Sequence, residues 1–181
     1  RDDDYGGSLE NRLRFLLEIL AGIREACGRT FPLGVRLSAE EFLGDQGNDL
    51  ATSCQIAIAL EQASIDFLDI SCTIPETPPE SALACIEPGT YEQGWKKFMA
   101  AAIKQHVRIP VIAVANIKEP EVAEAILREG CCDLVGVARG HLADPAWCNQ
   151  ARAGRAEMIR KCIGCLVCLN EIFHHRHVKC S

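Results

Sequence analysis

The residues that most clearly indicate chemistry are four cysteines near the C-terminal end, at the spacing C-x2-C-x2-C-x11-C. They are Cys162, Cys165, Cys168 and Cys180. Two residues between successive cysteines can turn three thiolates toward one point, and a distant fourth can complete the ligand set. Thiolates at this spacing suit either an iron–sulfur cluster or a tetrahedral zinc ion. Unligated or disulfide-bonded cysteines are the alternative, which close spacing without a secretory signal disfavours.

Further candidate residues lie where apolar segments end. Arg36 lies near the end of segment 31–38, and burying its guanidinium is costly unless it meets an anion or a carboxylate. A bound ligand and a structural ion pair both fit this position. Ala115 and Asn116 lie at the end of segment 110–115, and Ala138 and Arg139 at the end of segment 134–138. Small residues there allow backbone N–H groups to approach a phosphate, although they also suit a plain turn.

An alternation of helices and strands must position these residues. Apolar periodicity and end signals predict helices over 9–27, 49–62, 90–105, 120–130 and 145–153, the first beginning after Ser8 and ending at Gly28. Apolar runs predict strands over 31–38, 67–71, 110–115 and 134–138, as in a parallel sheet covered on both faces. Repeated βα units favour an α/β fold, either half of a (β/α)8 TIM barrel or an open doubly wound sheet. No G-x-G-x-x-G motif follows a strand, and four units make half a barrel.

Composition narrows the classes of partner. The chain has 181 residues, 48% of them hydrophobic, and a formal net charge of -6. Without a basic stripe, nucleic-acid binding is disfavoured, and no apolar run reaches membrane-spanning length. A small-molecule substrate is expected, and a homo-oligomer stays possible. The other seven cysteines lie in or beside apolar segments and are expected to be small buried residues in a reducing cytoplasm. They are Cys27, Cys54, Cys72, Cys85, Cys131, Cys132 and Cys148.

Several segments together resemble one known family. They are the opening RDDDYGGSLENRLRF, the strand GVRLS, the segment IPVIAVANIKEPEVAEAILREGCCDLVGVARGHLADP and the cysteine tail. In combination they resemble the FMN-dependent old yellow enzyme superfamily of NADH:flavin oxidoreductases. Within it they are most similar to the iron–sulfur branch, which includes 2,4-dienoyl-CoA reductase, trimethylamine dehydrogenase, enoate reductase and the bile-acid-inducible oxidoreductases.

This resemblance implies a TIM barrel with FMN at the C-terminal ends of its strands. Arg36 matches the arginine at the flavin pyrimidine edge, where a cation stabilises the reduced anionic flavin. Two pairs, Ala115–Asn116 and Ala138–Arg139, match the residues that hold the FMN phosphate. The first pair departs from the usual Gly-Arg or Asn-Arg and lacks a guanidinium. The four cysteines of the tail match ligands of a [4Fe-4S] cluster, so the resemblance favours iron–sulfur over zinc.

The resemblance also implies a division of the chain and a reaction. Residues 1–155 would form the C-terminal half of an FMN-binding barrel, and residues 156–181 a cluster segment that is truncated at its end. We expect a fragment of a NAD(P)H oxidoreductase that reduces, or forms, an activated C=C bond in an enoyl thioester, enoate or steroid-type enone. The proton donor is expected in the missing N-terminal half, and FAD and NAD(P)H are possible further cofactors of the full-length protein. The alternatives are a zinc-stapled α/β module without catalysis and a truncated product that is inactive alone.

Overall fold

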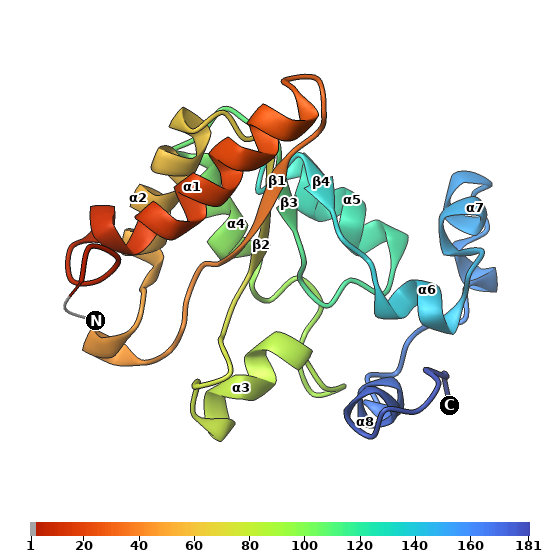
Figure 1. Ribbon diagram of the computed structural model, residues 1–181. Helices are drawn as coiled ribbons and strands as arrows, with labels where there is room; N and C mark the ends of the chain where they lie inside the picture. The colour runs from red at the N-terminus through yellow and green to blue at the C-terminus, as the bar shows by residue number, and fades with distance from the viewer. Residues whose placement is uncertain (1–2) are drawn as a thin grey trace.

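The computed structural model describes residues 3–181, with a parallel four-stranded sheet at its centre (Figure 1). The strands are β1 (Gly34–Ser38), β2 (Phe67–Ser71), β3 (Val111–Ala113) and β4 (Leu134–Val135). They are hydrogen-bonded in the order β1-β2-β3-β4, with every neighbouring pair parallel. In an open doubly wound sheet the strand order reverses at a switch point, whereas a barrel wall keeps the sequence order. The sequential order therefore supports the predicted half barrel.

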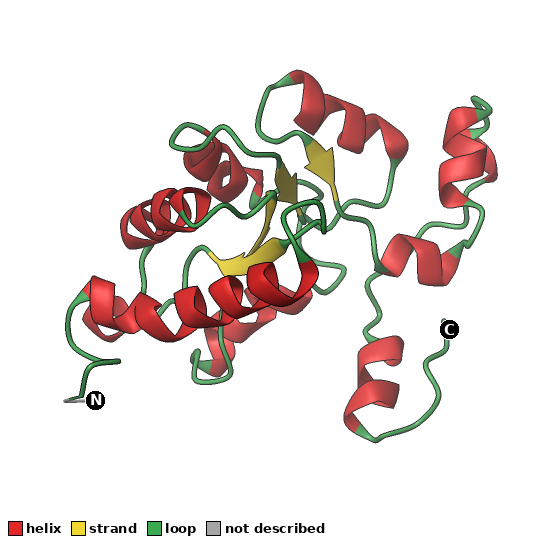
Figure 2. Ribbon diagram, turned by 45° about the horizontal axis from the view of Figure 1, so that its top comes forward, coloured by secondary structure: helices red, strands yellow, loops and turns green. Residues whose placement is uncertain are grey.

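Helices connect the strands and cover the sheet, as Figure 2 shows. The first helix begins after Ser8, whose hydroxyl accepts a hydrogen bond from the Asn11 N–H, and ends before Gly28, whose φ is 80°. Both predicted end signals are confirmed. The helices are α1 (Leu9–Cys27), α2 (Leu50–Gln62), α3 (Pro79–Ile86), α4 (Lys97–Lys104), α5 (Pro120–Arg128), α6 (Arg139–Ala143), α7 (Trp147–Arg152) and α8 (Val167–Phe173), with 3-10 turns at Gly44–Gln46 and Ala156–Met158.

The core lies between the sheet and the helices that cover it. Leu60 of α2, Leu68 of β2, Ile103 of α4 and Val111 of β3 are fully buried. Burying such side chains is the main favourable contribution to folding, at roughly 1.5–3 kcal/mol each. The same packing holds the C-terminal ends of the strands in place, where the predicted site residues lie. Within the described residues, every helix is too short or too polar to span a membrane.

Several elements differ from the sequence-based expectation. Helices α3, α6 and α8 are additional to the predicted ones, and the helix expected over 90–105 begins only at Lys97. Gly94 is the reason for the later start, because its φ of 77° is not helical and its N–H bonds the Ala115 carbonyl at 2.6 Å. The fourth strand is also shorter than expected, because it covers only Leu134–Val135 and residues 136–138 form the connection to α6, which begins at Arg139.

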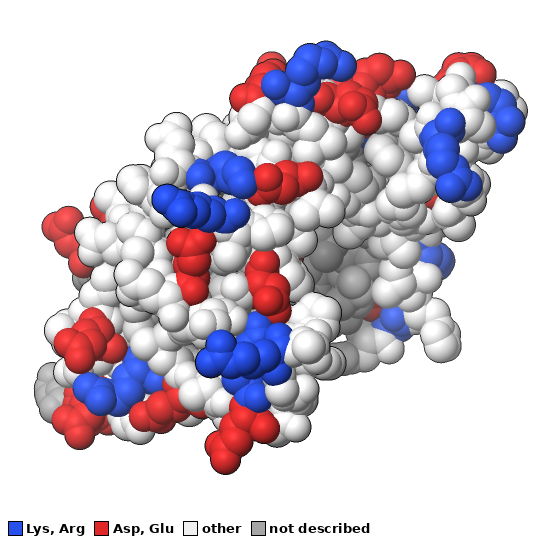
Figure 3. Space-filling model, turned by 90° about the horizontal axis from the view of Figure 1, so that it is seen from above, with Lys and Arg blue, Asp and Glu red and all other residues white. Residues whose placement is uncertain are grey.

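Acidic and basic side chains are interspersed on the face seen in Figure 3. One ion pair, between Lys104 Nζ and Asp133 Oδ2 at 2.6 Å, connects α4 to the loop before β4. The same carboxylate accepts the Val111 N–H at 2.8 Å. Burial acts to raise the pKa of Asp133, but these two contacts outweigh it and the pKa is lowered.

We expect Asp133→Asn to change the acid stability of the fold. A carboxyl group whose folded pKa is lowered adds stability above its unfolded pKa near 4, and this stability is lost as the pH falls through the folded pKa. The variant should be less stable at pH 7 by about 1 kcal/mol or less, because the pair is partly exposed, and equal to wild type at pH 2. Urea unfolding at both pH values measures this. If the free energies of unfolding of variant and wild type differed by the same amount at pH 7 and at pH 2, the prediction would be wrong.

Candidate cofactor site

The C-terminal ends of the strands surround a cavity of about 290 Å³, the strand-end hollow. The structure brings Arg36, Asn116, Ala138 and Arg139 to its wall, together with Lys118. Ala115 does not line the hollow and is completely buried behind it. The other predicted site residues therefore meet at one place although they lie far apart in the sequence. Three of the lining side chains are basic and one, Glu87, is acidic, so the wall carries a net positive charge that suits an anionic ligand.

Arg36 has the carboxylate partner that the sequence left open, and it also lines the hollow. Its Nη1 lies 2.5 Å from Asp69 Oδ2 on β2, directly across the sheet register, and its Nη2 lies 3.1 Å from Ser71 Oγ. The Arg36 side chain remains 55% exposed. Asp69 Oδ1 is buried and has no hydrogen-bond partner among the described residues. An ion pair and a ligand contact are thus compatible at this position.

Asn116 and Arg139 contact each other on the wall of the strand-end hollow. Asn116 has a left-handed backbone, with φ of 53°, and its side-chain amide donates to the Tyr91 carbonyl at 2.9 Å. Its Oδ1 accepts from Arg139 Nη2 at 3.3 Å. At Gly140 a Cβ would lie 2.6 Å from Val137 Cγ1, so a larger residue in the first turn of α6 would displace the Val137 side chain. The turn places backbone and guanidinium donors together, which is the donor set that a phosphate needs.

A buried carboxylate that the sequence analysis missed holds Arg139 in place. Glu87, only 2% exposed, ends α3 in a left-handed conformation with φ of 47°. Its carbonyl accepts from Arg139 Nη1 at 2.8 Å, and its Oε2 lies 3.4 Å from Arg139 Nη2. Its Oε1 accepts from Trp95 Nε1 at 2.7 Å and lies 3.2 Å from Lys96 Nζ. No spacing in the sequence indicates this contact, because the three donors come from two distant parts of the chain, the turn before α4 and the first residue of α6.

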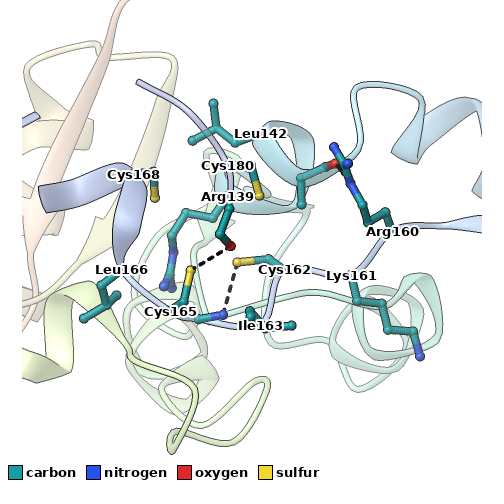
Figure 4. Close-up of a pocket in the computed structure, with 13 residues that line it drawn as sticks. Arg139, Leu142, Arg160, Lys161, Cys162, Ile163, Cys165, Leu166, Cys168 and Cys180 are labelled. Carbon is teal, nitrogen blue, oxygen red and sulfur yellow. Dashed lines mark hydrogen bonds between the residues drawn. The ribbon is translucent and has the colours of Figure 1, made fainter. Parts of the chain in front are cut away.

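The four tail cysteines line a second cavity of about 210 Å³, the cysteine hollow (Figure 4). Cys162 and Cys165 come from the loop before α8, Cys168 from α8 itself and Cys180 from the segment after it. All four are free thiols. Within residues 3–181 no three cysteine, histidine or acidic side chains are close enough to form a ready metal site. The thiols share one cavity, and closing them on a metal requires further approach.

The local chemistry of the cysteine hollow suits metal ligation. The hydrogen bond between Cys165 Sγ and Ser181 Oγ, at 3.3 Å, lowers the pKa of Cys165, and the Val167 N–H lowers it further. A lowered pKa favours the thiolate, which is the form that binds metals. Cys162 Sγ accepts the Gly164 N–H at 3.4 Å. Four free thiols with N–H and O–H donors around one cavity therefore fit a metal or an iron–sulfur cluster.

Two residues belong to both cavities. Cys162 and Arg139 line the strand-end hollow and the cysteine hollow alike. The two cavities are thus neighbours that share part of one wall. This arrangement would place two bound groups next to each other.

The cysteine loop is docked on the loop that follows α3. Gly89 donates its N–H to the Gly164 carbonyl at 3.1 Å. A Cβ at position 164 would lie 2.5 Å from the Gly89 nitrogen, and one at position 89 would lie 2.7 Å from the Ile163 carbonyl oxygen. Gly164 also has φ of 68°. This close approach of two backbones explains why both positions are glycine.

The other seven cysteines are not uniformly buried, which corrects the expectation from sequence. Cys54, Cys72, Cys131 and Cys132 are buried, and burial raises the pKa of Cys72 to about 11. Cys27 lies at the exposed end of α1, and Cys148 is exposed on α7, where the packing of a short helix leaves one face uncovered. Cys85 is half-buried and lines the strand-end hollow.

Comparison with known proteins identifies the family. Residues 1–158 match the NADH:flavin oxidoreductase / NADH oxidase family. The chain is 45% identical over 183 aligned positions to an NADH oxidase of Thermoanaerobacter brockii, and the match covers 100% of this chain and 27% of that protein. It is 38% identical to a metal reductase of Desulforamulus reducens, and the match covers 99% of this chain and 26% of that protein. A 2-naphthoyl-CoA reductase structure in complex with 2-naphthoyl-CoA superimposes with a TM-score of 0.91 at 32% identity, covering 99% of this chain and 27% of that one.

The chain therefore belongs to the NADH:flavin oxidoreductase / NADH oxidase family, as the sequence motifs predicted. It spans about a quarter of the length of these relatives. The family match ends at residue 158, before the first tail cysteine, whereas the similarity to the relatives continues over essentially the whole chain.

Proposed function

We propose that this chain supplies half of an FMN-binding barrel, over residues 1–155, and a [4Fe-4S] cluster segment, over residues 156–181, in a NAD(P)H-dependent oxidoreductase. The observation that carries the proposal is the shared wall of the two hollows, formed by Arg139 and Cys162. A basic cavity beside a cavity lined by four thiols suits a phosphate-bearing redox cofactor next to a cluster. FMN accepts and donates a hydride, and an iron–sulfur cluster exchanges single electrons.

The residues of this chain would bind and orient these groups. Arg139 and the Asn116 amide, with the backbone of the turn at Ala138, would hold the FMN phosphate through charge-assisted hydrogen bonds. Arg36 would place a cation beside the reduced flavin and stabilise its negative charge, while Asp69 keeps its guanidinium in place. Cys162, Cys165, Cys168 and Cys180 would hold the cluster.

The family and one relative support a proposal for the substrate class. The 2-naphthoyl-CoA reductase structure holds 2-naphthoyl-CoA, which is a conjugated acyl thioester. We infer that the protein reduces, or forms, a C=C bond activated by a carbonyl group, as in an enoyl thioester, enoate or steroid-type enone. We assign the NAD(P)H site, any FAD site and the proton donor to parts of the protein outside this chain. The free thiols fit a reducing compartment such as the cytoplasm.

Cofactor analysis of the native protein tests this proposal. Purified without oxygen, the protein that carries this chain should contain flavin and about four iron and four sulfide per chain. Adding NADH or NADPH should bleach the flavin absorbance, and an enone should restore it. A colourless protein with one zinc per chain would overturn the proposal in favour of a zinc-stapled module. Flavin without iron would retain the barrel assignment and overturn the cluster assignment.

A further inference from the structure

Lys96 is a charged side chain that the proposed function does not use. It directly precedes α4, is only 4% exposed and does not line either hollow. Its ammonium lies 3.2 Å from Glu87 Oε1, 3.4 Å from the Ala84 carbonyl and 3.9 Å from Cys72 Sγ. Burying an ammonium is costly, so a lysine here calls for an explanation beyond packing.

The charges around Glu87 do not cancel. One carboxylate, Glu87, faces two cations, Lys96 and Arg139. Arg139 alone would suffice to neutralise Glu87, so the added lysine leaves this buried group with one net positive charge. This group borders the strand-end hollow, whose wall includes Glu87 as well as Arg139 and Lys118, while Lys96 lies behind the wall. The net charge therefore favours an anion in that cavity, and the fixed guanidinium of Arg139 gives it a direction.

The geometry separates the roles of the two partners. Glu87 fixes the Arg139 guanidinium with both its carbonyl and its carboxylate, on two different nitrogens. The Lys96 ammonium and Trp95 Nε1 both contact the other oxygen of the Glu87 carboxylate, Oε1. Without Lys96 the negative charge of Glu87 would be balanced by Arg139 alone, and the attraction of Arg139 for an anion would fall.

We propose that Lys96 is a positioning residue for phosphate binding, which offsets the charge of Glu87 and so leaves Arg139 available to the phosphate of FMN. The inference rests on the proposed function, because it assumes that FMN occupies the strand-end hollow. It adds to that function a buried residue, outside the cavity, that sets affinity for the phosphate and not for the flavin ring.

Two flavins distinguish this role from a structural one. Titration of the apoprotein, followed by quenching of flavin fluorescence, should show that Lys96→Met weakens FMN binding by about tenfold, the order expected for one unit charge near a partly desolvated phosphate. Binding of riboflavin, which has no phosphate, should not change. Lys97→Met is the matched control, because this adjacent lysine is partly exposed and pairs with Glu129 on the surface, and it should bind both flavins like wild type.

Each outcome decides the inference. Unchanged FMN affinity, or an equal loss of affinity for FMN and riboflavin, would overturn it while leaving the proposed function intact. A wild-type protein that binds neither flavin would overturn the proposed function as well. The double variant Lys96→Met with Glu87→Gln tests the charge balance directly, because it removes both buried charges and leaves Arg139 as the one net positive charge of the group, as in wild type. We expect it to recover most of the lost FMN affinity, and a double variant as weak as the single one would contradict the inference.

Discussion

Replacing Cys168 by alanine should abolish the cluster while leaving the flavin bound. Cys168 lines only the cysteine hollow, so its loss removes one of four thiolates without touching the strand-end hollow. With three ligands remaining, iron and acid-labile sulfide should fall from about four per chain to near zero. Flavin content should stay at the wild-type level. Chemical analysis of iron and sulfide, with visible absorbance of the purified protein, measures both.

The matched control is Cys27→Ala, because Cys27 is an exposed thiol that lines neither hollow. It should retain full iron, sulfide and flavin. A Cys168→Ala protein with full iron content would exclude this residue as a ligand. If Cys27→Ala also lost iron, the effect would reflect general thiol chemistry and not a defined site.

Gly164→Ala should also remove most of the cluster, although it deletes no ligand. A Cβ at this position would lie 2.5 Å from the Gly89 nitrogen and 2.7 Å from its Cα, and the backbone φ of 68° adds strain. The loop that carries Cys162 and Cys165 must then move away from Gly89. We expect iron per flavin to fall at least several-fold and the free energy of unfolding to fall by about 1–3 kcal/mol.

Gly154→Ala separates the effect of backbone strain from the effect of the steric clash with Gly89. Gly154 has the same φ of 68°, but nothing lies within 4 Å of a Cβ placed there. It should lose a similar amount of stability from backbone strain and keep its iron. If both variants kept iron equally, the contact between Gly89 and Gly164 would not position the cluster loop.

Much of the fold could be predicted because local signals and tertiary structure agree. The cap at Ser8 and the stop at Gly28 set the bounds of α1, and β2 is bounded as its apolar run predicted. Helix α3 was missed because its prolines resemble a turn, yet Pro79 lies at the first helical position, where the lack of an N–H costs nothing. The short helix α8 lies inside the cysteine segment, where the ligand spacing dominated the interpretation.

The candidate site could be predicted only in part. Arg36 lies in an apolar strand and Asn116 and Arg139 follow two others, and parallel strands bring such positions together, so the strand-end hollow was foreseeable. Their roles toward FMN, and those of the four cysteines toward a cluster, stay predictions. Glu87 and Lys96 were missed because they meet through loop geometry, with Glu87 in a left-handed conformation that no pattern indicates. Neither residue lies at a strand end.

The contact between Gly89 and Gly164 has a consequence for how the protein matures. Gly89 belongs to the crossover between β2 and β3, so the docking surface for the cysteine loop exists only after that crossover has packed. The cysteine segment leaves the ribosome after this crossover and can find its platform already built. If the segment binds a cluster as proposed, metal insertion would be a late step of biogenesis, carried out on a barrel wall that is folded beforehand.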